Sequence, residues 1–160
     1  MDRIVILTKG DEESGMGHLY RTATLLNHLE SRANCYVYAI VPTTIETPLL
    51  TDTESYCEQV DNLVDVAVDV TPNTLIVDLP EDQDDETLST LVSDIGPDHV
   101  VAFGNWDKWS HPEFKSQVDT FVDFSTQPLS FESSRRRSNG ITYLLGPRYM
   151  LLREEFHEWK

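Results

Sequence analysis

Residues 15–21 read Gly-Met-Gly-His-Leu-Tyr-Arg, and this stretch joins an apolar strand to an amphipathic helix. Four consecutive apolar residues at 4–7 precede it and predict a parallel strand that is buried on both faces. Residues 17–31 follow with leucine and alanine at helical spacing, which predicts a helix with one apolar stripe. Gly15 and Gly17 allow a tight turn that brings the main chain close to a ligand. The stretch therefore predicts the strand, turn and helix with which many α/β domains begin.

A helix start of this kind is suited to an anionic ligand, because its free N–H groups and its dipole favour negative charge. His18 lies at the start of the helix and Arg21 lies one turn further on, so both can face one ligand. The same arrangement also occurs in domains that bind nothing there. The stretch is not the dinucleotide fingerprint, because Tyr20 stands where the third glycine would be.

The chain is strongly acidic. Its 160 residues include 28 acidic and 12 basic ones, which gives a formal net charge of −16. This charge argues against nucleic acid and anionic membranes as partners. Only four basic residues are lysine, and acid excess with scarce lysine suggests a halophilic protein, although an ordinary acidic protein remains the alternative.

Nothing in the sequence predicts export or membrane insertion. The N-terminal residues lack the pattern of a signal peptide, which is a basic segment followed by an apolar one. No apolar run approaches the length of a membrane-spanning helix. Cys35 and Cys57 lack the spacing of a metal site, and Cys35 lies in a strand-like run typical of the core. We therefore expect a cytoplasmic protein without metal or cofactor.

Further strands and helices alternate along the chain. We expect strands at 33–41, Thr74–Asp78, His99–Phe103, 118–124 and Ile141–Leu145, and a helix at 82–95. A short helix at 51–59 and a half-buried strand at 60–70 are expected in between. Alternation of this kind predicts an α/β fold, a Rossmann-like, mostly parallel sheet with helices on both faces. We expect one domain at 1–150, then a helix or the start of an interdomain linker at 151–160.

Three other groups of residues could bind a ligand. Asp78 and Glu81 follow a buried strand, at the edge where open α/β sheets bind ligands, although a solvated strand end is the alternative. Trp106 and Trp109 could line a sugar site or anchor their loop. The arginines at 135–137 lie in an expected polar loop, 127–139, and could clamp a phosphate or simply be solvated.

Two motifs resemble those of nucleotide-sugar enzymes with the two-domain GT-B fold. Residues 15–21 match a Gly-x-Gly-His-x-x-Arg signature, and the sequence is similar there to the UDP-sugar hydrolases of the pseudaminic acid pathway and to spore-coat polysaccharide biosynthesis proteins. Residues 144–156 resemble the segment that leads out of the N-terminal domain in that family.

The resemblance implies the N-terminal half of a GT-B fold and metal-independent hydrolysis of a UDP-sugar at its anomeric carbon. His18 would match the catalytic histidine of the family. Histidine is suited to act as a general base, because the ordinary pKa of an imidazole is close to neutral pH. Gly15, Met16, Gly17 and Arg21 would position the substrate. Asp78 and Glu81 would hold sugar hydroxyls. The uridine diphosphate would be bound by a C-terminal domain or a partner chain.

The chain also departs from the family pattern. Leu79, Pro80 and Glu81 replace a His-Tyr-Gly-type run, and Phe103 and Gly104 replace an Asp-Asp pair. These departures leave two alternatives open, a non-catalytic domain that binds a ligand or a partner, and one half of a glycosyltransferase.

Overall fold

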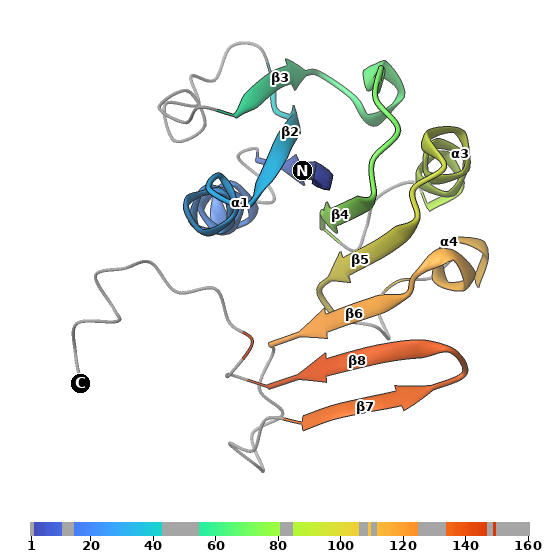
Figure 1. Cartoon of the computed structure of the whole chain (residues 1–160). Helices are drawn as coiled ribbons and strands as arrows, with labels where there is room; N and C mark the ends of the chain where they lie inside the picture. The colour runs from blue at the N-terminus through green and yellow to red at the C-terminus, as the bar shows by residue number, and fades with distance from the viewer. Residues whose placement is uncertain are drawn as a thin grey trace, which may run out of the picture.

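A computed structural model describes residues 2–10, 15–42, 55–80, 85–105, 109, 112–124, 134–146 and 149 of the chain. Eight strands form one sheet in the order β3-β2-β1-β4-β5-β6-β8-β7 (Figure 1). Their bounds are β1 Asp2–Lys9, β2 Ala33–Ile40, β3 Tyr56–Val60, β4 Thr74–Asp78, β5 His99–Phe103, β6 Thr120–Asp123, β7 Ser134–Ser138 and β8 Ile141–Leu145. All neighbouring strands are parallel except β7, which runs antiparallel to β8.

Helices cover both faces of this sheet. Helix α1 (Gly17–Leu29) buries Leu19 and Leu26 in a cluster on one face, against strand residues such as Ile6. Helices α3 (Asp85–Ile95) and α4 (Pro112–Gln117) lie on the opposite side of the sheet from α1, as Figure 1 shows. They bury apolar residues in a second cluster with the other faces of the strands. The expected α/β class, the mostly parallel sheet and its two covered faces are therefore confirmed.

The order of the first six strands, 3-2-1-4-5-6, is that of the Rossmann fold. The chain runs outward through β1, β2 and β3, and then returns to the other side of β1 to continue through β4, β5 and β6. The point of reversal lies between β1 and β4. In the described part of the chain, no helix is both long and apolar enough to cross a bilayer.

Two expectations for the segment between β2 and β4 were wrong. Residues 56–59 belong to β3 instead of a helix, since Tyr56 and Cys57 extend the sheet beside β2. Residues 61–70 form no strand, and contain only the short 3-10 helix η1 (Leu63–Asp65). Val66, Val68 and Val70 stand at alternate positions and pack against the core without forming a strand.

The end of the chain also differs from expectation. Helix α4 was missed, and the arginine-rich segment expected to be a loop is strand β7. Asn139 and Gly140 connect β7 to β8, with φ angles of 51° and 84°. Two positive φ angles are what a tight two-residue hairpin turn requires, so the Asn-Gly pair imposes a strand on polar residues.

The two cysteines, which lie in or against the core on the α1 face of the sheet, predict how the stability of the protein depends on pH. Burial, followed by the charge of Glu30, raises the pKa of the Cys35 thiol, and burial raises the pKa of Cys57. A thiol that stays protonated in the folded state but ionises when unfolded lowers stability at high pH. The free energy of unfolding should therefore fall as the pH rises above the ordinary thiol value of 9.0. Denaturant titrations across this range should show a weaker fall in Cys35→Ala than in the wild type.

Candidate functional site

The candidate site lies where the strand order reverses, at the carboxyl ends of β1 and β4. In open α/β sheets this crevice is the usual place for a ligand. Thr8 on β1 is in register with Asp78, the last residue of β4. Helix α1 begins at Gly17, after the connection that follows β1, and brings its first turns to the same edge.

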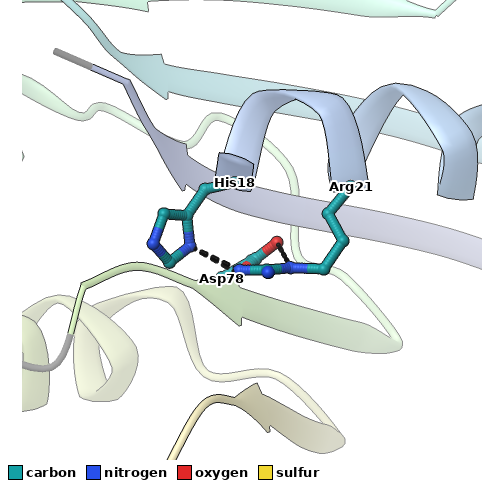
Figure 2. Close-up of polar contacts among 3 residues, drawn as sticks. All are labelled: His18, Arg21 and Asp78. Atoms are coloured by element: carbon teal, nitrogen blue, oxygen red, sulfur yellow. Dashed lines mark hydrogen bonds and ion pairs between the residues drawn. The ribbon is translucent and has the colours of Figure 1, made fainter. Parts of the chain in front are cut away.

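Figure 2 shows His18 and Arg21 on α1 and Asp78 at the end of β4 pointing toward one another. Nδ1 of His18 lies 2.8 Å from Oδ1 of Asp78. The alternative of a solvated strand end is therefore wrong, because the Asp78 side chain is only 5% exposed. The sequence placed all three residues near one ligand site, and the structure brings them into direct contact.

Arg21 is held on two sides. Its Nε donates to Oδ2 of Asp78 at 2.8 Å, and its Nη2 donates to Oδ1 at 2.5 Å. The two bonds make a bidentate ion pair. Its guanidinium carbon lies 4.8 Å from the centre of the Phe124 ring, in the geometry of a cation–π contact. Both oxygens of Asp78 and most of the Arg21 guanidinium therefore face protein groups.

The proton on His18 has two possible positions in this cluster. Nδ1 lies 2.8 Å from the Asp78 carboxylate and 2.7 Å from Nη2 of Arg21. A protonated Nδ1 donates to the carboxylate and leaves Nε2 with its lone pair. An unprotonated Nδ1 accepts from Arg21 and puts the proton on Nε2. Only the first tautomer makes Nε2 a base, so the tautomer decides the chemistry of the site.

The start of α1 offers main-chain donors beside this cluster. Met16 is the N-cap residue and makes no side-chain capping bond. The N–H groups of the first helical turn have no carbonyl partner within the helix, and no acidic side chain stands among these residues. Gly15 turns the chain into the helix with a φ of 72°, a conformation that favours glycine.

The two glycines of this turn should respond differently to alanine. Gly15→Ala should lower the free energy of unfolding by about 1 kcal/mol, because only its positive φ resists a side chain. Gly17 has no positive φ and no heavy atom near a new Cβ, so Gly17→Ala should keep or raise stability. If the main chain of Gly17 approaches a ligand, Gly17→Ala should weaken ligand binding without lowering stability. Thermal melts and ligand titrations of both variants check these results.

Other expected site residues lie away from the cluster or outside the described residues. Trp109 is 1% exposed and packs against Phe114, with ring centres 4.8 Å apart, in the core on the face opposite α1. It anchors its loop and does not line a site with His18. Glu81, Trp106 and residues 151–160 lie outside the described residues. Within the described residues, no three His, Cys, Asp or Glu side chains gather in a group that could hold a metal ion.

Two residues near the cluster were not expected from the sequence. Phe124 follows β6 and supplies the ring over which Arg21 lies. Thr8 is fully buried beside Asp78, and its hydroxyl has no hydrogen-bond partner among the residues that the structure describes. Thr8 follows the apolar residues 4–7 of β1 just as Asp78 follows the apolar residues 75–77 of β4, so its position was a usable signal. Phe124 carried none, since an aromatic residue after a strand is ordinary.

Comparison of the chain with protein-family models, with curated proteins and with solved structures finds no match in any of the three. Fold and site together define an α/β domain of Rossmann strand order with a His-Arg-Asp cluster at its reversal point.

Proposed function

We propose that this domain carries the general base of a nucleotide-sugar hydrolase, acting on a UDP-linked sugar at its anomeric carbon. The observation that supports it most is the 2.8 Å contact between Nδ1 of His18 and the Asp78 carboxylate. A carboxylate that accepts a hydrogen bond from Nδ1–H fixes the orientation of the ring. It leaves the lone pair of Nε2 to accept a proton from water. The motif that contains His18 supplies the choice of substrate, through its resemblance to UDP-sugar hydrolases.

In the proposed reaction, Nε2 of His18 takes a proton from water as the water oxygen bonds to the anomeric carbon. The bond between that carbon and the phosphate oxygen breaks, and UDP leaves with the electron pair. Gly15, Met16 and Gly17 present main-chain N–H groups at the positive end of α1, which suits the phosphates. A second domain or a partner chain binds the uridine.

The contacts of Asp78 and Arg21 give them other roles than the sequence suggested. Both oxygens of Asp78 bond to protein groups, so we assign it to positioning His18 instead of holding sugar hydroxyls. Arg21 in turn holds Asp78 and lies over Phe124. For Glu81, binding of a sugar hydroxyl stays a prediction.

The second candidate is a non-catalytic domain that binds a ligand or a partner. The engagement of Arg21 within the protein favours it, because an arginine held in this way is not available to clamp a phosphate. A glycosyltransferase half would use the same fold and the same base with an alcohol in place of water.

The direct experiment incubates the protein with a UDP-N-acetyl sugar in water labelled with heavy oxygen, at high salt. The proposal expects UDP release with the label on the sugar, because water attacks carbon. Label on the phosphate would mean attack at phosphorus and would contradict the reaction. Saturable binding without any turnover would favour the non-catalytic domain.

A further inference from the structure

We propose that the outer edge of β7 docks an acidic, extended segment of a partner protein by adding it as a further strand to the sheet. Strand β7 is the last in the sheet order, and Figure 1 shows it at the outer end. Within the described part of the chain, no strand pairs with its outer side. All of its residues are exposed.

This strand concentrates positive charge in an acidic protein. Arg135, Arg136 and Arg137 are consecutive, and they are three of only 12 basic residues. Within the described residues, none of the three pairs with a carboxylate. A dense positive patch that no carboxylate of the described residues neutralises presents a site for carboxylates from elsewhere.

The hairpin determines which groups of β7 face outward. Ser138 and Ile141 flank the two-residue turn, and the pair that closes such a turn exchanges both main-chain hydrogen bonds. Bonded pairs alternate along an antiparallel ladder, so Arg136 bonds to β8 while the N–H and C=O groups of Arg135 and Arg137 point outward. The open edge therefore carries its donors and acceptors on two arginines.

The side chains of these two arginines share one face. Arg136 lies over the Tyr143 ring, with its guanidinium carbon 5.2 Å from the ring centre. Side chains alternate along a strand, so Arg135 and Arg137 lie on the other face. A segment with acidic residues at alternate positions would pair its carboxylates with both arginines.

The same charges argue against two other partners. Two copies of β7 paired edge to edge would set arginine beside arginine, and like charges facing each other across strands destabilise the pair. Nucleic acid would meet a chain with a net charge of −16. The patch is also separate from Asp78 in the His18 cluster, because four strand spacings between β4 and β7 amount to about 19 Å.

The test measures fluorescence anisotropy of a short labelled peptide in which glutamate alternates with threonine. The proposal expects saturable binding below about 1 mM, and binding at least about ten-fold weaker when glutamine replaces glutamate. Arg135→Glu/Arg137→Glu should lose binding, whereas the charge-matched control Arg3→Glu/Arg32→Glu should keep it. Failure of the wild type to bind at about 1 mM would overturn the proposal.

Two further measurements separate strand addition from simple charge attraction without changing the protein. The peptide is N-methylated either at every glutamate or at every threonine, since successive amides of a strand face opposite edges. Loss of binding in only one of the two forms supports strand addition, and unchanged binding in both overturns it. Tighter binding of single-stranded RNA than of the acidic peptide, lost in Arg135→Glu/Arg137→Glu, would also overturn it.

Discussion

Replacing His18 by alanine should lower the rate of UDP-sugar hydrolysis by about 10²–10⁴-fold, because it removes the only group that we assign as general base. The fall should appear mainly in kcat, because our proposal assigns binding of the sugar nucleotide to main-chain groups of α1 and to a second domain or partner chain. Steady-state measurement of UDP release gives both kcat and KM. A change in KM alone would mean that His18 binds the substrate and does not act on water.

The matched control for this variant is His28→Ala. His28 lies on the same helix, in its last turn, and is exposed. It should lose no activity, and both variants should keep the wild-type circular dichroism spectrum. Equal losses in His18→Ala and His28→Ala would show that the helix, and not the His18–Asp78 contact, accounts for the effect.

Replacing Asp78 by leucine should lower the free energy of unfolding by about 3 kcal/mol, because it leaves the Arg21 guanidinium without its carboxylate in a largely buried place. Arg21→Leu should have a similar effect, since it leaves a carboxylate that is 95% buried without its cation. Urea titrations of both variants measure these losses. Asp94→Asn, at an exposed position on α3, is the control and should change stability by less than about 0.5 kcal/mol.

The double variant Asp78→Leu/Arg21→Leu tests whether the two residues act as a pair. Removing both charges leaves no unpaired ion, so the double variant should be more stable than the sum of the single losses implies. A coupling free energy of about 1–3 kcal/mol is expected. Additive losses would show that the ion pair contributes nothing beyond its separate side chains.

Much of the fold could be predicted from the sequence because the parallel strands are buried. Unbroken apolar runs such as 4–7 and 75–77 leave little choice of structure. The failures lie where packing and not periodicity decides. Val66, Val68 and Val70 alternate as in a strand, yet they pack on the core after η1 without forming one. Strand β7 is polar but is held by its hairpin turn.

The site was predictable in its parts but not in its contacts. A histidine and an arginine at a helix start, and an aspartate at a strand end, each suggested a ligand. The reversal of strand order between β1 and β4 brings them together, and that depends on the whole sheet. The sequence could not show that Asp78 bonds to protein groups, because the contact joins residues 60 positions apart.

The measurement that tests the central claim most directly is NMR spectroscopy of the isotope-labelled imidazole nitrogens of His18. The chain has five histidines, so the His18 signals are identified by their loss in His18→Gln. Our account predicts a protonated Nδ1 bonded to Asp78 and an unprotonated Nε2, and it predicts that Asp78→Leu removes this preference. A protonated Nε2 with Nδ1 accepting from Arg21 would contradict it, because His18 would then have no lone pair to offer to water.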